Sequence, residues 1–253
     1  MKTHENLALA YQTQYDAGKS AWRDTGAKHK VRNMEAVLQG KRFASLLEVG
    51  AGDGAVLAYM EQAKIATRLS AVEISESGVR QIQSRNLPTL QDVQLFDGYQ
   101  LPYPDQHFEA VVCTHVIEHV EHPRLLLREI KRVSKYQIFE VPIDFSWHVD
   151  KRLKHFLGYG HINIFTPATF RFLLMSEGFK VKQDLATLTS SELWQMEASI
   201  VKQTMPLMRF YSWYALNSLK RTAWHLQTRA MKDRKPNAYT VFCEASQDDI
   251  TIF

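Results

Sequence analysis

The sequence predicts an α/β fold in which a mostly parallel sheet is covered by helices on both faces. Short apolar runs alternate with helical segments between residues 41 and 143, the pattern of strands joined by crossover helices. The first run leads directly into a glycine-rich turn. The chain has 253 residues, 45% of them hydrophobic and 23% charged, which suits one globular domain with additions.

The elements follow in order along the chain. Residues 1–40 are expected to form an N-terminal helical cap that ends at Gly40, and residues 41–253 the main domain. The expected order within it is strand 42–49, helix 55–63, strand 69–75, helix 76–85, strand 93–98, strand 108–116, one helix through 117–133 and strand 136–143. Strands of this kind are buried on both sides, so they read as continuous apolar runs.

The later part of the chain departs from this alternation. Thr166 and Pro167 predict the start of a helix that Gly178 ends. Two more strands, 180–188 and 238–245, are separated by a helical insertion at about 190–235. An amphipathic stripe beginning after Pro206 is expected to pack on the sheet or to form a lid or homodimer surface. Its members are Met208, Tyr211, Ala215, Leu219, Ala223, Leu226 and Ala230.

Composition excludes several classes of protein. Cys113 and Cys243 both fall in predicted buried strands, so we expect no disulfide framework and a reducing, cytoplasmic location. The N-terminus lacks the apolar core of a secretory signal. No run of about 18 apolar residues occurs, which argues against a membrane span.

The net charge of +4 is unevenly placed. Residues 201–240 contain eight Lys and Arg residues and one Asp, a net +7, which leaves about −3 for the remainder. A basic lobe predicts an anionic partner or an anionic membrane surface, although a solvated helix face is the simpler explanation. Aromatic residues among the basic ones would also suit single-stranded nucleic acid, but no RNA-binding module is recognisable, so nucleic acid is not the expected partner.

The glycine turn lies in the stretch LLEVGAGDGAV, residues 46–56. Gly50, Gly52 and Gly54 give G-x-G-x-G, whereas the dinucleotide-binding fingerprint is G-x-G-x-x-G. Asp53 lies inside the turn, where a carboxylate would repel a pyrophosphate. Capping of the following helix is the alternative role of Asp53.

Acidic residues also end neighbouring predicted strands. Glu48, Glu73 and Asp97 all fall where open α/β sheets bind ligands, and Glu73 lies about 20 residues beyond the turn, where an acid binds ribose hydroxyls. Together with Asp53 they form a set of acids with no basic residue among them. The set indicates a positively charged ligand that bears a ribose, and S-adenosyl-L-methionine fits this description.

Four segments together resemble class I S-adenosylmethionine-dependent methyltransferases, in the branch that contains quinone-biosynthesis and bacterial small-molecule enzymes. They are LLEVGAGDGAV, AVEIS, LFDGYQLPYPDQHFEAVVCTHVIEHV and GHINIFTPATFRFLLMSEGF. The resemblance covers roughly residues 44–179. It implies a Rossmann-like, seven-stranded, mostly parallel sheet whose last strand, 238–245, is antiparallel.

The resemblance also implies the binding site of S-adenosyl-L-methionine. Glu48 and the turn would surround the methionine moiety, Glu73 would bind the ribose, and Asp97 would meet the adenine. The expected cofactor-binding residues are Glu48, Gly50, Ala51, Gly52, Gly54, Glu73, Ile74, Asp97, Gly98, Thr114 and His115.

The stretch HVIEH places His115, Glu118 and His119 on one face of the expected helix, and His161 follows the fifth strand. Such a set can bind a divalent metal. Its spacing resembles the E-x-x-E-H…H set of the methyltransferases that modify the 3′ ends of small RNAs, but His115 stands where Mg²⁺ would prefer a carboxylate, and we assign no metal ligand. The competing role is a general base, for which His161 is the first choice, with His115 and His119.

The sequence therefore predicts an S-adenosylmethionine-dependent methyltransferase that acts on an oxygen or nitrogen of a small or lipid-linked molecule. The alternatives are a metal-assisted RNA 2′-O-methyltransferase, a nicotinamide-dependent oxidoreductase and a non-catalytic binding protein on the same fold. Tyr11, Tyr15 and Trp22 either close over the cofactor or dock the N-terminal helices. Asp144 and His148 either orient an acceptor or cap the next segment.

Overall fold

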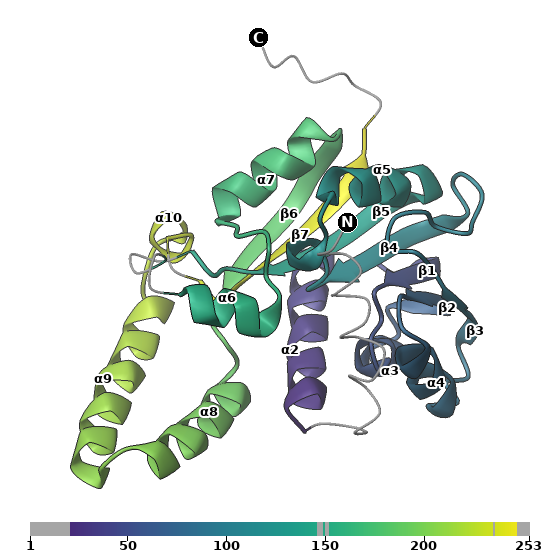
Figure 1. The fold of residues 1–253 in the computed structure, drawn as a ribbon. Coiled ribbons are helices and arrows are strands. Elements are labelled where there is room, and N and C mark those ends of the chain that lie inside the picture. The colour runs from purple at the N-terminus through teal and green to yellow at the C-terminus, as the bar shows by residue number, and fades with distance from the viewer. Residues whose placement is uncertain (1–20, 146–148, 150–151, 235, 247–253) are drawn as a thin grey trace.

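A seven-stranded sheet forms the centre of the computed structural model, which describes residues 21–145, 149, 152–234 and 236–246 (Figure 1). The strand order is β3-β2-β1-β4-β5-β7-β6. The strands are β1 Phe43–Val49, β2 Ala66–Glu73, β3 Leu90–Leu95, β4 Phe108–Thr114, β5 Ser134–Pro142, β6 Phe179–Thr187 and β7 Ala238–Ala245. All pairs are parallel except those of β7 with β5 and β6, which confirms the Rossmann-like fold and its antiparallel last strand.

Helices cover both faces of the sheet (Figure 1). They are α2 Ala21–Leu38, α3 Ala55–Gln62, α4 Glu76–Ser84, the short 3₁₀ helix η1 Ile117–His119, α5 Pro123–Val133, α6 Leu153–Tyr159, α7 Pro167–Ser176, α8 Ser191–Thr204, α9 Leu207–His225 and α10 Arg229–Lys232. Helices α5 and α7 pack on one face, and α2, α3 and α4 pack on the other. Among the described residues, no helix has the length and apolar character that crossing a bilayer requires.

Two apolar clusters form the core, one on each face of the sheet. Leu46 and Leu47, neighbours in β1, belong to opposite clusters and are both fully buried. Successive side chains of a strand point to opposite faces, so a central strand covered on both sides must be apolar throughout. Cys113 and Cys243 are buried and unpaired, as expected.

The single helix expected through residues 117–133 is wrong. The chain forms η1, leaves the helical conformation, and begins α5 at Pro123. Proline disfavours a helical residue before it, and His122 has φ −121° and ψ 71°. His115 precedes η1 with a φ of +56°, so HVIEH is not one face of a helix.

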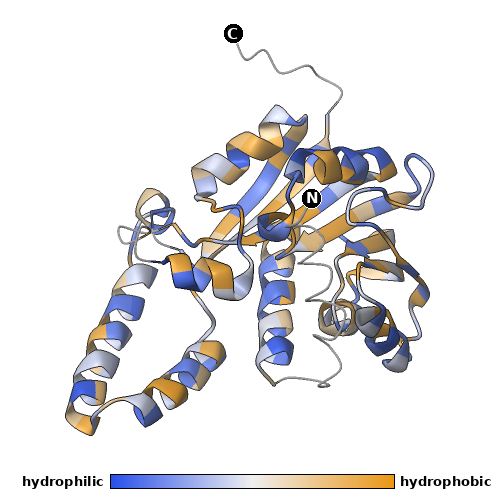
Figure 2. Cartoon of the chain, in the orientation of Figure 1, coloured by the Kyte–Doolittle hydropathy of each residue, from blue (hydrophilic) through white to orange (hydrophobic). Residues whose placement is uncertain are grey.

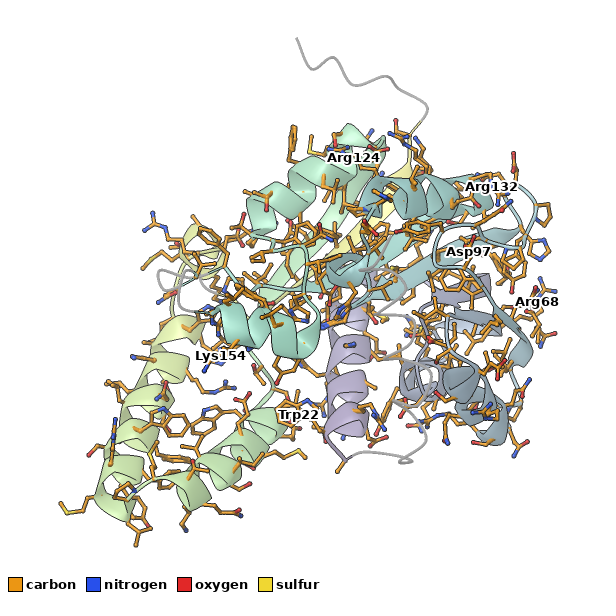
Figure 3. All side chains as sticks on the ribbon, in the orientation of Figure 1. Trp22, Arg68, Asp97, Arg124, Arg132 and Lys154 are labelled. Carbon is orange, nitrogen blue, oxygen red and sulfur yellow. The ribbon has the colours of Figure 1, made fainter. Side chains whose placement is uncertain are left out.

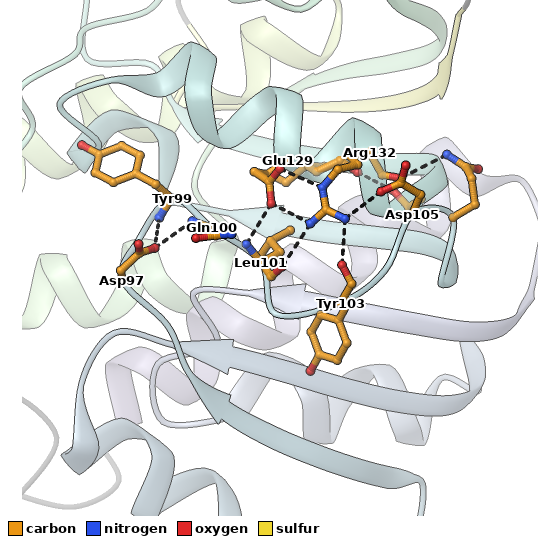
Figure 4. A network of polar contacts seen from close by, with 11 residues as sticks. Asp97, Tyr99, Gln100, Leu101, Tyr103, Asp105, Glu129 and Arg132 are labelled. Atoms are coloured by element: carbon orange, nitrogen blue, oxygen red, sulfur yellow. Dashed lines mark hydrogen bonds and ion pairs between the residues drawn. The ribbon is translucent and has the colours of Figure 1, made fainter.

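The third strand also ends earlier than expected, at Leu95 instead of residue 98. Asp97 ends the extended run because its Oδ1 accepts hydrogen bonds from the backbone N–H groups of Tyr99 and Gln100, at 2.8 and 2.7 Å (Figure 4). An aspartate that bonds its own following backbone makes a turn.

The insertion before β7 is a hairpin of α8 and α9 that projects beyond the sheet (Figure 1). Helix α9 packs on α8 through aromatic rings, among them Tyr214, which lies 4.7 Å from Trp194 between ring centroids. The predicted stripe faces outward instead: Met208 is 86% exposed and Leu226 is 85% exposed. Figure 2 shows apolar residues interspersed with hydrophilic ones along this helix. Packing of the stripe on the sheet is therefore wrong.

Candidate functional site

The turn after β1 requires its glycines. Gly50, Gly52 and Gly54 have φ values of +71°, +57° and +74°, in the left-handed region that favours glycine. A Cβ on Gly50 would also lie 2.5 Å from a methyl group of Val116. The turn leads directly into α3, whose N-cap residue is Gly54.

Asp53 is paired with basic residues, which corrects the expectation that the acids have none among them. Its carboxylate lies 3.4 Å from Arg23 Nε and 3.4 Å from an Arg85 side-chain nitrogen. It also accepts a hydrogen bond from the backbone N–H of Ala55, at 3.0 Å. Asp53 thus stabilises the first turn of α3, which is close to its alternative role as a cap.

Glu48 is the buried acid of the set with a carboxylate oxygen that lacks a donor among the described residues. It is 2% exposed, and its Oε2 has no hydrogen-bond partner among the residues that the structure describes. Burial raises the pKa of Glu48 well above its usual value, and the nearby carboxylates of Asp53 and Glu73 raise it further. A buried acceptor that lacks a donor is costly, so this position suits a cationic hydrogen-bond donor from a ligand.

Glu73 fixes the glycine turn from the end of β2. Its Oε2 accepts a hydrogen bond from the backbone N–H of Gly52 at 2.9 Å, and its Oε1 accepts from the backbone and hydroxyl of Ser75. A backbone donor that a pyrophosphate would use is therefore already bound to a carboxylate. A carboxylate oxygen retains a second lone pair, which leaves capacity for a ribose hydroxyl.

A cavity of about 360 Å³, here named the turn cavity, lies between α2 and the glycine turn. It brings together six of the predicted cofactor residues: Glu48, Gly50, Ala51, Gly52, Thr114 and His115. The other five, Gly54, Glu73, Ile74, Asp97 and Gly98, do not line it, and their roles stay predictions. Trp22 lines it from α2, whereas Tyr11 and Tyr15 lie outside the described residues. Figure 3 labels Trp22 on α2, beside α8.

Sequence reasoning missed several residues of this lining. They come from α2, from β5 and from the segments around β6 and β7, and they include His29, Lys30, Glu140, Thr189, Glu197 and Asn237. Most carry no local signal, because only the packing of α2 and α8 brings them to the turn. Glu140 does carry one, since it is an acid inside the apolar run IFEVP.

Asp97 is exposed, and hydrogen bonds from an arginine stabilise the loop that follows it (Figure 4). Arg132 donates to the carbonyl oxygens of Leu101 and Tyr103 and pairs with Glu129 at 2.7 Å. This network positions the loop that would meet the adenine. It involves no ligand, so binding of adenine by Asp97 and Gly98 stays a prediction.

His115 is the predicted catalytic histidine that lines the turn cavity. Its Nε2 lies 3.2 Å from Glu140 Oε1. Burial alone would raise the pKa of Glu140, but hydrogen bonds from His115 and Thr240 hold it at about 2. Burial lowers the pKa of His115 to about 4, so the imidazole is neutral at pH 7. Because a carboxylate can only accept, Nε2 carries the hydrogen and Nδ1 carries the lone pair.

His119 and His161 do not line the turn cavity; they form a second cluster with Glu118, whose Oε1 lies 3.7 Å from His115 Nδ1. Glu118 is 1% exposed, burial raises its pKa to about 7, and neither carboxylate oxygen has a hydrogen-bond partner among the described residues. One ligand atom each from Glu118, His119 and His161 lie within 4.8 Å of one another, so two imidazoles and a carboxylate could hold a divalent cation.

Asp144 is part of this second cluster. Its Oδ2 lies 2.5 Å from His161 Nδ1, and its Oδ1 lies 3.2 Å from His155 Nε2. Asp144 therefore orients histidines. His148, which was singled out with it, lies outside the described residues.

Comparisons with known proteins identify relatives of this chain. The family model described as "Methyltransferase domain" matches residues 21–184. The putative methyltransferase YrhH of Bacillus subtilis (strain 168) is 32% identical to this chain over 90 residues, which are 35% of this chain. Ajmaline N-methyltransferase of Rauvolfia serpentina is 28% identical over 98 residues, which are 37% of this chain. The chain spans half the length of YrhH and a third of the length of the Rauvolfia enzyme.

A solved structure with a similar fold is Haemonchus contortus phosphoethanolamine N-methyltransferase 2, in complex with S-adenosyl-L-methionine. The TM-score is 0.61 at 11% sequence identity, over 94% of this chain and 60% of that one. At this identity the likeness shows the fold alone.

Proposed function

This chain belongs to the family of class I S-adenosylmethionine-dependent methyltransferases, and on that premise we propose that it methylates an oxygen or nitrogen atom of a small or lipid-linked molecule. The observation that supports this most directly is the buried, donorless Oε2 of Glu48 beside the glycine turn. The cofactor supplies a methyl group on a sulfonium ion, and the protein's main task is to align the acceptor in a dry site.

The residues around the turn fit this cofactor. Glu48 would accept a hydrogen bond from its ammonium group, and the glycines would let the backbone approach it closely. Glu73 accepts from the ribose hydroxyls with the lone pairs that Gly52 and Ser75 leave. A dinucleotide fits less well, because the diphosphate would face Glu48 and Glu73.

His115 is the proposed proton acceptor for the methyl acceptor's hydroxyl or amine. It lines the turn cavity, and Glu140 fixes the tautomer that leaves Nδ1 with a lone pair. His115 therefore replaces His161, which the sequence favoured as the general base. His161 and His119 instead hold the second cluster together behind His115.

The outward stripe of α9 supports the lipid-linked form of the acceptor. Exposed apolar residues and basic residues on one helix suit an anionic membrane surface. Leu219→Glu in this stripe is expected to weaken binding to phosphatidylglycerol vesicles at least fivefold, with Leu153→Glu on α6 as an equally exposed control. Equal binding of both variants and the unchanged protein would end the membrane proposal.

Thermal denaturation with S-adenosylhomocysteine and with NAD tests the proposed function. We expect S-adenosylhomocysteine to raise the melting temperature by several degrees and NAD to leave it unchanged. Transfer of labelled methyl groups to a library of hydroxyl and amine compounds then tests turnover. Stabilisation by NAD alone would refute the proposal, whereas cofactor binding without transfer to any acceptor would favour a non-catalytic binding protein.

A further inference from the structure

A second cavity of about 610 Å³, here named the hairpin cavity, lies between the α8–α9 hairpin and the segments that join the hairpin to the sheet. Trp194 of α8 and Trp213 and Trp224 of α9 line it. The hairpin and turn cavities share three lining residues, Thr189, Glu197 and Asn237, so they adjoin each other. A molecule in the hairpin cavity would therefore lie next to the place where methyl transfer is proposed.

The charge on the hairpin cavity is unbalanced. Lys220, Arg221 and Arg234 line it, and Glu197 is the one acid among its described lining residues. None of the three basic residues forms an ion pair with a described carboxylate. An excess of positive charge around a concave site favours an anionic ligand.

Arg221 is fixed at the wall of this cavity by two contacts. Its guanidinium lies 5.2 Å from the ring centroid of Trp194, and it donates a hydrogen bond to the carbonyl oxygen of Thr189 at 2.7 Å. Partial burial lowers the pKa of Arg221, and the nearby carboxylate of Glu197 raises it in part. A guanidinium fixed in this way has donors left for a carboxylate.

Trp224 supplies a further unused donor. Its indole Nε1 is buried and has no hydrogen-bond partner among the described residues. A buried donor without an acceptor is costly, and an indole N–H usually finds one. The cavity therefore offers flat aromatic surfaces and an excess of positive charge, and the Trp224 N–H lies unused in its wall.

We propose that the hairpin cavity binds the methyl acceptor and that the acceptor is an aromatic acid, a planar apolar molecule that carries a carboxylate. The tryptophans contact the ring, and Arg221 binds the carboxylate. The volume lies in the range of small-molecule sites. The assignment of the ligand as the acceptor rests on the proposed function, whereas the preference for an aromatic acid does not.

Calorimetry on the full chain with 2-naphthoate and with 2-naphthamide tests this proposal. The two probes share the ring and differ in charge. We expect 2-naphthoate to bind at least tenfold more tightly, since a hydrogen bond to a charged group is worth about 1.5–3 kcal/mol. Arg221→Gln is expected to remove most of this difference and to leave 2-naphthamide unaffected.

Arg209→Gln is the matched control, because it removes the same charge from an exposed position of α9 that does not line the cavity. Trp194→Leu is the second variant and is expected to weaken both probes alike. Equal affinity for the two probes, or equal loss in Arg221→Gln and Arg209→Gln, would overturn the proposal.

Binding of S-adenosylhomocysteine is measured on the same samples. It is expected to change less than twofold in Arg221→Gln, because Arg221 does not line the turn cavity. Failure of the unchanged protein to bind it would reject the proposed function but not the preference for an aromatic acid. Normal cofactor binding without a preference for 2-naphthoate would reject the inference alone.

Discussion

Replacement of Glu48 by glutamine tests the cofactor site at its most specific point. The substitution keeps the size of the side chain and removes its ability to become a carboxylate. Glu48 is buried, and its Oε2 lacks a donor among the described residues, so a bound ammonium group would make a charge-assisted hydrogen bond in a dry place. Such a bond is worth about 1.5–3 kcal/mol, which corresponds to roughly a 10- to 100-fold loss of affinity.

The raised pKa of Glu48 also predicts in which direction the affinity for S-adenosylhomocysteine changes with pH. Because the pKa of Glu48 is raised well above its usual 4.5, the carboxyl group is protonated over part of the range above pH 4.5 in the free protein. Pairing with an ammonium group requires loss of that proton. Affinity for S-adenosylhomocysteine is therefore expected to rise with pH up to the raised pKa, with release of a proton, and Glu48→Gln is expected to abolish this rise.

Isothermal titration calorimetry with S-adenosylhomocysteine measures both quantities, in two buffers of different ionisation enthalpy. Stability provides the folding control: an acid whose pKa is raised by folding costs stability as pH rises through that pKa, so the variant gains relative stability at high pH. Wild-type affinity in Glu48→Gln, or an unchanged pH dependence, would refute the assignment of Glu48 to the ammonium group.

Three further predictions concern the neighbouring residues. Gly50→Ala is expected to lower the melting temperature in thermal denaturation by about 5 °C or more. The reason is that Gly50 has a φ of +71° and that the new Cβ would lie 2.5 Å from a Val116 methyl group. An unchanged melting temperature would contradict the turn geometry. Glu140→Gln frees the His115 tautomer, so methyl transfer is expected to fall at least tenfold while S-adenosylhomocysteine affinity, measured by calorimetry, changes less than twofold. Burial raises the pKa of Glu118 to about 7, so its carboxyl group costs stability as pH rises from 4.5 through 7. In chelator-treated protein Glu118→Gln should therefore unfold at higher denaturant concentration than wild type at pH 8 and not at pH 5, and equal gains at both pH values would argue against a buried, donorless carboxylate.

The fold could be predicted because its signals are local. Strand β1, the glycine turn and α3 follow one another within residues 43–62, and each is set by apolar runs, glycines and helix starts that the sequence displays. The break between η1 and α5 also has a local signal, Pro123, at which α5 begins. A proline inside a helical pattern is better read as a boundary.

The site was predictable only in part, because its missing members come from distant segments. Arg23 and Arg85 reach Asp53 from two different helical regions, and the sequence near Asp53 does not predict these ion pairs. The prediction that the α9 stripe packs on the sheet failed for a related reason. Periodicity identified the stripe, but its residues are exposed, and it is Trp213, Arg221 and Trp224 of this helix that line the hairpin cavity. Periodicity alone does not say which partner a helix has.

A crystal structure of the complex with S-adenosylhomocysteine tests the central claim most directly. The account predicts the amino group within hydrogen-bond distance of Glu48, in the cavity between α2 and the glycine turn, and the ribose hydroxyls at Glu73. A ligand bound elsewhere, or a nucleotide whose diphosphate lies along residues 50–54, would contradict it.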